Sequence, residues 1–210
     1  MKKLKIVSVI TTFALVAVFF AGCETIKQIS DSIASLQKVQ FKLDGVDNFR
    51  LSGINLSNKK SVSDFSLGDG AKLLSAFRNK DFMADFTLDV AAKNPNDGSG
   101  KTTQTTAILQ QLDWNLYIDN KETINGVVNK NIKIPGTGQT EIIPLGISLD
   151  LYEFFGNKGY DDMLNLALAI GGKQGSASRL KLDAKPTIST DLGPITYPGR
   201  ITIVDKQWSN

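Results

Sequence analysis

The chain has 210 residues, 41% of them hydrophobic, and carries 24 lysine and arginine residues against 21 aspartate and glutamate residues. This size and apolar share allow one well-packed domain with room for a small appendage. Histidine is absent and Cys23 is the single cysteine, which excludes Ser-His-Asp and Cys-His catalytic arrangements and the ordinary zinc sites.

The first 22 residues have the three parts of an export signal. Three lysines stand among the first five residues, an uncharged apolar segment of 15 residues runs from residue 6 to residue 20, and the small pair Ala21-Gly22 follows. The apolar segment is shorter than the ~20 residues that a membrane-spanning helix needs. We therefore expect residues 1–22 to be a signal peptide rather than a permanent transmembrane helix.

The stretch Phe20-Ala21-Gly22-Cys23 resembles the lipobox of bacterial lipoproteins. The resemblance implies cleavage between Gly22 and Cys23 and acyl chains, such as palmitate, on Cys23. One acyl chain holds a protein only marginally, whereas the two chains of a diacylglycerol thioether anchor it stably. We therefore expect a lipid-anchored protein of the bacterial cell envelope, at the outer membrane, whose thiol is blocked for chemistry. The alternative is an ordinary secretory signal followed by an incidental cysteine.

Charge gives little support for a nucleic-acid partner. Because three of the 24 basic residues lie in the signal, the mature chain has 21 basic and 21 acidic residues and lacks a long basic cluster. The adjacent pair Asp161-Asp162 does not face one site on a helix, and we interpret it as the acidic first turn of a helix. No other group of Asp, Glu, Lys or Tyr residues has a spacing that is typical of a catalytic site. We therefore expect no catalytic residue, metal site or cofactor, and no enzyme activity.

Residues 23–38 form the expected tether, polar with isoleucines and a leucine near helical spacing. Beyond it the apolar residues alternate, which predicts strands over residues 39–44, 49–56, 82–90, 112–118, 123–128, 132–134, 141–151, 180–185 and 200–205. Helical spacing predicts short packed helices over 70–77 and 160–170. At Gly53 the alternation slips by one residue, which predicts a β-bulge or a bend between sheets.

This pattern predicts a mainly β fold, an antiparallel β-sandwich of the fibronectin or immunoglobulin kind with one or two short packed helices, preceded by a signal-peptide helix and a tether. The sandwich domain covers residues 39–210. Turns are expected at residues 93–100, 119–121 and 135–138, where turn-forming residues cluster.

Residues 86–151 resemble the group-2 late embryogenesis abundant family, also called the water stress and hypersensitive response (WHy) domain. The matching pieces are Phe86-Thr87-Leu88-Asp89-Val90, Asn94-Pro95-Asn96, Leu112-Asp113-Trp114-Asn115-Leu116-Tyr117-Ile118-Asp119, Gly126, Ile134-Pro135-Gly136-Thr137-Gly138 and the strand from Glu141. The resemblance implies a fibronectin-like sandwich and a stress-protective role that shields other macromolecules or membranes, without an enzymatic reaction.

Three features have two interpretations each. Asn94, Pro95 and Asn96 form either a loop device, with Asx turns and positive φ at Gly98, or a recognition loop. Trp114 shares the apolar face of its strand and is expected in the core, the alternative being a contact with a ligand. Tyr117 shares the polar face, where it is either simply exposed or covered by another segment, or contacts a sugar as an aromatic ring among acids and amides is able to do.

Two functional hypotheses follow. The first is a membrane-anchored, non-enzymatic envelope lipoprotein that acts as a binding, structural or stress-protective module, with the membrane and an unknown envelope partner as its contacts. The alternative is a carrier or sensor of an apolar ligand, held between the sheets or beneath the 160–170 helix. Its motivation is the richly apolar run from Met163 to Ile170, which exceeds what one helix face needs.

Overall fold

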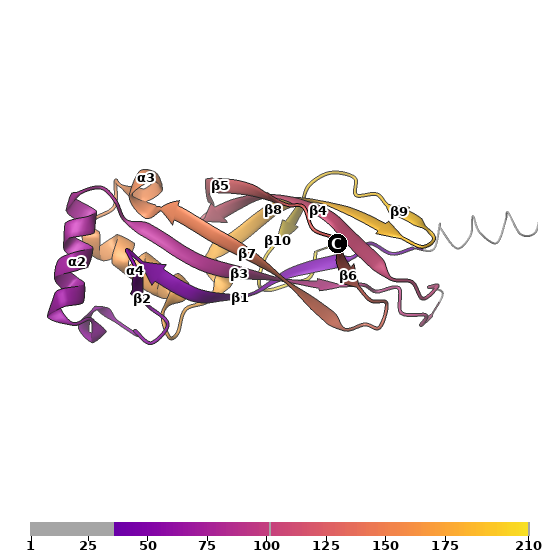
Figure 1. Cartoon of the computed structure of the whole chain (residues 1–210), viewed down its shortest axis with the longest axis horizontal. Coiled ribbons are helices and arrows are strands. Elements are labelled where there is room, and N and C mark those ends of the chain that lie inside the picture. Colours follow the sequence, from indigo (N-terminus) through magenta and orange to yellow (C-terminus); the bar gives the residue numbers. More distant parts are fainter. Residues whose placement is uncertain (1–35, 101, 210) are drawn as a thin grey trace, which may run out of the picture.

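The computed structural model describes residues 36–100 and 102–209 (Figure 1). The expected signal peptide, Cys23 and most of the tether therefore lie outside the described residues. Two antiparallel sheets with a few short helices make up the fold, which confirms the prediction of a mainly β protein. Within the described residues, no helix combines the length and the apolar character needed to cross a bilayer.

The first sheet has the strand order β2-β1-β3-β7. Its strands are β1 (Gln40–Leu51), β2 (Ile54–Asn55), β3 (Met83–Lys93) and β7 (Thr140–Asp150). Register is unbroken between β3 and β7, from Met83 opposite Asp150 to Lys93 opposite Thr140. Along β7 the odd-numbered residues from 143 to 149 are buried and the even-numbered residues between them are exposed, as expected for a strand with one face in a core.

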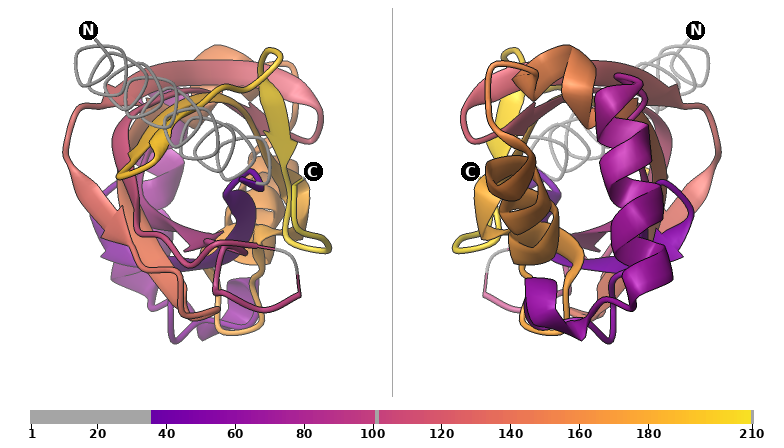
Figure 2. Two further views of the ribbon diagram at one scale, coloured as in Figure 1. Left: turned by 90° about the vertical axis from the view of Figure 1, so that its right-hand side faces the viewer. Right: turned by 90° about the vertical axis from the view of Figure 1, so that its left-hand side faces the viewer.

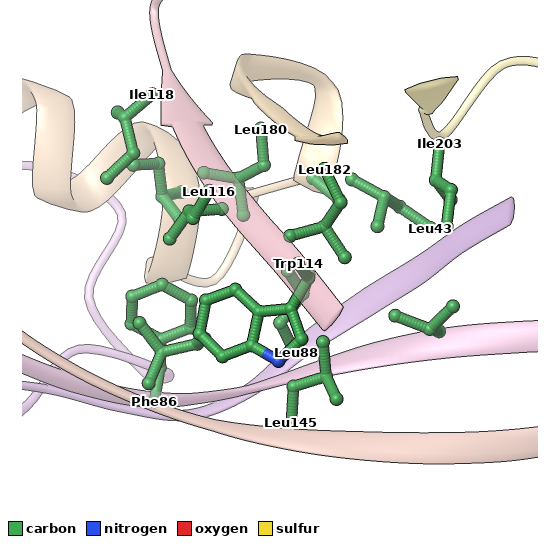
Figure 3. Close-up of a cluster of buried hydrophobic side chains, with 14 of the residues drawn as sticks. Leu43, Phe86, Leu88, Trp114, Leu116, Ile118, Leu145, Leu180, Leu182 and Ile203 are labelled. Carbon is green, nitrogen blue, oxygen red and sulfur yellow. The ribbon is translucent and has the colours of Figure 1, made fainter. Parts of the chain in front are cut away.

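The second sheet has the order β10-β8-β4-β5, with β6 paired to the beginning of β4 and β9 paired to the end of β8. Its strands are β4 (Ala107–Ile118), β5 (Lys121–Val128), β6 (Ile132–Ile134), β8 (Leu180–Thr190), β9 (Gly193–Ile195) and β10 (Ile201–Ile203). Inward-facing side chains of the two sheets meet in one core, in which Trp114 lies among Phe86, Leu88, Leu145 and Leu182 (Figure 3).

The irregularity at Gly53 is a hairpin turn, so the prediction of a bulge or a bend between sheets was wrong. Leu51 pairs with Ile54, and the two residues between them, Ser52 and Gly53, have φ of 46° and 79°. Positive φ at both central residues is the type I′ pattern, whose twist matches that of paired strands. The shifts of register lie inside β1 instead, between Leu43 and Gly45 and between Asp47 and Arg50.

The helices gather at one end of the sandwich (Figures 1 and 2). They are α2 (Leu67–Arg78), α3 (Leu151–Phe155) and α4 (Tyr160–Gly171), with single 3-10 turns at Val62–Asp64 and Ala177–Arg179. α2 begins three residues before its predicted start because Ser66 and Asp69 form a capping box. α4 begins at Tyr160 as predicted, with Asp161 and Asp162 in its first turn. α3 was not predicted.

One side of the sandwich is joined by the C-terminal segment. The Leu43 N–H donates to the Val204 carbonyl at 3.0 Å, and the Ser209 N–H donates to the Phe41 carbonyl at 2.8 Å. The Ser209 hydroxyl in turn accepts from the Phe41 N–H at 2.9 Å. Since β10 belongs to the second sheet and Phe41 to the first, these bonds connect the two sheets along this side.

Candidate functional site

The Asn-Pro-Asn segment lies where β3 ends, at the end of the sandwich opposite the helices, here called the loop end (Figure 1). Asn96 is fully buried, and its side-chain amide pairs with the backbone of Gln37. The Gln37 N–H donates to Asn96 Oδ1 at 2.8 Å, and Asn96 Nδ2 donates to the Gln37 carbonyl at 2.9 Å. The side-chain amide of Asn96 therefore makes the pair of hydrogen bonds that the backbone of a neighbouring strand would make. It fixes the position at which the chain enters the fold.

Asn94 is also fully buried and connects two further segments. Its Nδ2 donates to the carbonyls of Thr105, at 2.8 Å, and Ile134, at 3.2 Å. Its Oδ1 accepts from the backbone N–H and from Nδ2 of Asn96, at 3.1 and 2.9 Å. Buried polar groups that are left without partners cost about 1–3 kcal/mol each, so this network stabilises the loop end.

These contacts favour the interpretation of Asn94, Pro95 and Asn96 as a loop device. Both side-chain amides are occupied by groups of the chain, and only Pro95 is partly exposed. Gly98 has the expected positive φ, 84°. A direct role of this loop in recognition stays a prediction.

A groove lies beside this network, between β6 and the beginning of β7. It encloses about 620 Å³ and is open to solvent. Its lining includes the apolar residues Ile132, Pro135, Ile142 and Pro144 and the charged residues Lys130, Lys133 and Glu141. It is connected to the asparagine network through Gly136, whose Cβ, if present, would lie 2.2 Å from the carbonyl oxygen of Asn96.

Ile142 is the large apolar side chain of β7 that faces out of the core, and 41% of it is exposed. Pro144, two residues further, lacks an N–H and lies on an edge strand, where proline hinders pairing with another strand. The groove is therefore better suited to side-chain contacts than to the addition of a β-strand.

Trp114 is 6% exposed and lies in the core, as predicted (Figure 3). It pairs with Gly126 of β5, where a Cβ would lie 2.4 Å from Trp114 Cζ2. The glycine leaves the space that the indole ring fills. Trp114 Nε1 has no hydrogen-bond partner among the described residues.

Tyr117 lies on the outer face of the second sheet, as predicted. Its hydroxyl donates to Glu122 Oε2 at 2.9 Å, and this bond raises the pKa of the phenol. Lys181 Nζ lies 4.2 Å from the ring centroid. A hydrogen bond and a cation-π contact thus already engage the ring, which leaves a sugar contact without structural support.

Arg200 occupies the same outer face and is held by two aspartates. Its guanidinium lies 3.1 Å from Asp113 Oδ1 and 3.3 Å from Asp183 Oδ2. Such partly exposed ion pairs contribute little to stability individually, but they satisfy the charged groups of this face locally.

The apolar run of α4 is packed on several sides. Within Met163–Ile170, all residues except Asn165 and Ala169 are buried. At the end of the helix, a Cβ on Gly171 would lie 2.0 Å from Phe49 Cγ, so the helix rests closely on β1. Burial in the core therefore accounts for this composition, and the carrier hypothesis stays a prediction. Among the described residues no group of three or more acidic or cysteine side chains is arranged to hold a metal ion.

No family model matches the chain, and a search of curated proteins finds no match. A search of solved structures does find matches. A protein from Archaeoglobus fulgidus has a TM-score of 0.30 and 9% identity, covering 54% of this chain and 76% of its own. The structural-genomics target SoR45 has a TM-score of 0.33 and 12% identity, and the match covers 81% of this chain and 87% of that target. The solution structure of a candidate late embryogenesis abundant (LEA) protein has a TM-score of 0.32 and 15% identity, and the match covers 89% of this chain and 79% of that protein. At these TM-scores the likeness carries no argument about function.

Proposed function

We propose that this chain is an envelope lipoprotein whose sandwich acts as a non-enzymatic binding, structural or stress-protective module. Residues 1–22 direct export, Cys23 carries the acyl chains, and residues 23–38 connect the anchor to the sandwich. The observation that carries the proposal is the point at which the chain enters the fold. Gln37 is fixed at the loop end by Asn96, so a lipid anchor at Cys23 attaches the domain by that end.

A second contact secures the same point. The Tyr197 hydroxyl donates to the Val39 carbonyl at 2.8 Å, and burial raises the pKa of this phenol far above its ordinary value. Two residues of the entering segment are therefore held by distant parts of the fold, Asn96 and Tyr197. Because the entering segment is hydrogen-bonded to the fold at both residues, a force applied through the tether is transmitted to the whole sandwich.

The tether limits the distance of the domain from the membrane. Thirteen residues, 24 to 36, separate Cys23 from Gln37, and a fully extended chain of that length spans about 45 Å. The loop end therefore stays within about 45 Å of the bilayer surface, while α2, α3 and α4 lie at the opposite end.

The non-enzymatic part of the proposal is supported by how the polar groups are used. Asn94 and Asn96 bond to backbone, Tyr117 to Glu122, and Arg200 to its two aspartates. The stress-protective part is supported by the resemblance of residues 86–151 to the WHy domain. An apolar ligand co-purifying with the delipidated protein in native mass spectrometry would favour the carrier alternative instead.

Fractionation of cells that produce the full chain tests the proposal. Wild-type protein is expected in the membrane fraction and in the detergent phase of a phase separation, because two acyl chains hold it stably. Cys23→Ala removes the site of acylation and is expected to abolish both processing and detergent partitioning. Thr25→Ala, two residues downstream, keeps the cysteine and serves as the matched control. Unchanged membrane association and processing of Cys23→Ala would contradict the anchoring.

A further inference from the structure

The groove between β6 and β7 shares the loop end with Gln37, where the tether meets the domain. Pro135 lines the groove, and its neighbour Gly136 packs against the backbone of Asn96, whose side chain holds Gln37. In the proposed arrangement the groove therefore lies at the end of the domain to which the tether attaches.

The composition of the groove suits the interface of a bilayer. Ile142 offers an exposed apolar side chain, and Lys130 and Lys133 are exposed at the rim. Neither lysine forms an ion pair with a described residue, and Glu141 is the one acidic residue of the lining. An apolar side chain flanked by lysines is the pattern with which peripheral proteins contact anionic lipid surfaces.

The other charged residues that the structure describes at the loop end are close to balanced. Hydrogen bonds from Ser99 lower the pKa of the Asp97 carboxyl, and the nearby Lys93 lowers it further. Lys38 and Asp191 are both exposed at this end. The excess of positive charge is therefore local to the groove, where Lys130 and Lys133 stand against Glu141.

We propose that this groove is the face by which the domain docks on the surface of the membrane to which it is tethered, with Ile142 at the interface and Lys130 and Lys133 on anionic headgroups. The proposal rests on the proposed function, because the tether supplies the proximity. A tether of this length keeps the local concentration of the surface high, so a weak contact suffices to orient the domain. Each lysine is expected to strengthen docking about fivefold at low salt.

A single introduced thiol reports the docking. Since acylation blocks Cys23, the only reactive cysteine of Ile142→Cys is the introduced one, which accepts an environment-sensitive fluorophore. The processed, lipidated protein is reconstituted through its own acyl chains into vesicles of phosphatidylcholine with or without phosphatidylglycerol. Leu67→Cys, 96% exposed at the opposite end, is the matched control position.

The expected result is an apolar environment and protection from aqueous quencher at position 142 in the anionic vesicles, and full exposure at position 67. Lys130→Gln together with Lys133→Gln is expected to weaken docking about thirtyfold at low salt, and high salt is expected to have the same effect on the unsubstituted groove. Lys60→Gln together with Lys173→Gln, at two positions that are also exposed but lie at the other end, is expected to leave docking unchanged.

Equal exposure of positions 142 and 67 in anionic vesicles, or no effect of the groove substitutions, would overturn the docking face. Anchoring is read separately in the same samples. Labelling of wild-type protein at Cys23, or loss of the protein from the vesicles, would instead contradict the proposed function.

Discussion

The side-chain amide of Asn96 pairs with the backbone of Gln37 across 59 residues of sequence, with hydrogen bonds of 2.8 and 2.9 Å. Gln37 lies three residues before β1, and Asn96 is fully buried three residues after the end of β3. One side chain thereby holds the segment that enters the fold at the loop end.

Replacing this amide is expected to destabilise the domain. Asn96→Ala removes the partners of the part-buried Gln37 N–H and carbonyl, and it removes one of the two donors to Asn94 Oδ1, which keeps the backbone N–H of residue 96. Since an unsatisfied buried polar group costs about 1–3 kcal/mol, a loss of about 1–3 kcal/mol in the free energy of unfolding is expected from urea titration. Asn129→Ala, at an exposed position between β5 and β6, is the matched control and is expected to change stability by less than about 0.5 kcal/mol. Equal effects of the two substitutions would contradict the role of Asn96.

The contact between Gly126 and Trp114 predicts a steric effect. Gly126→Ala places a Cβ 2.4 Å from the indole ring, and overpacking of this kind costs about 1–3 kcal/mol. Gly146→Ala, on an open face of β7 with no atom within 4 Å, is expected to have little effect. The loss for Gly126→Ala is expected to shrink in the background of Trp114→Phe, because the smaller ring leaves room. A cost that is the same in both backgrounds would show that the indole is not its cause.

The hairpin turn predicts a backbone effect at Gly53. Its φ of 79° lies in the left-handed region, where a residue with a Cβ pays about 1–2 kcal/mol. Gly53→Ala is therefore expected to lower the free energy of unfolding by about that amount. Gly68→Ala, in the first turn of α2 with its nearest neighbour at 3.8 Å, is expected to leave stability unchanged or to raise it. Thermal unfolding of both variants distinguishes a backbone cause from a general intolerance of alanine.

Asp89 predicts a dependence of stability on pH. Desolvation and the neighbouring Asp47 raise the pKa of its carboxyl above the ordinary 3.8, so the folded protein binds this proton more tightly than the unfolded chain does. The resulting loss in the free energy of unfolding is absent below the ordinary pKa, and it grows as the pH rises from the ordinary pKa through the raised one. Asp89→Asn is therefore expected to stabilise the protein at pH 7, and the gain is expected to vanish below the ordinary pKa.

Asp69 provides the control of opposite sign. Hydrogen bonds from Ser66 lower the pKa of the Asp69 carboxyl, so its contribution to stability is present at neutral pH and is lost as the pH falls through the lowered pKa. Asp69→Asn is expected to destabilise at pH 7 and to be neutral in acid. Denaturant titrations between pH 3 and pH 7 with the same sign for both variants would contradict these assignments.

Much of the sheet structure could be predicted because burial of one face imposes a period of two. Strands β3 and β7, with their clear alternation, were predicted within a few residues, and the turn at Asp119 and Asn120 follows from two residues that tolerate positive φ. The Ser52-Gly53 turn was misinterpreted because the same slip in phase fits a bulge, a bend or a two-residue hairpin. Only the pairing partner, here Ile54, distinguishes them.

The contacts that define the loop end could not be predicted, because they are set by the tertiary fold. The partners of Asn94 and Asn96 lie 40 and 59 residues away, and the groove exists only because β6 and β7 meet at the edges of different sheets. The end of β8 was missed since Pro186 interrupts its pattern, although the strand continues to Thr190. α3 was missed because five residues are too few to show a helical period.

The intact mass of the mature protein, purified from the membranes of cells that produce the full chain, tests the central claim most directly. The proposal predicts a polypeptide that begins at Cys23 and carries the added mass of a diacylglycerol group and its acyl chains, with the thiol unreactive toward alkylating reagents. A mature chain that begins at any other residue, or one whose Cys23 is unmodified and alkylated, would contradict it.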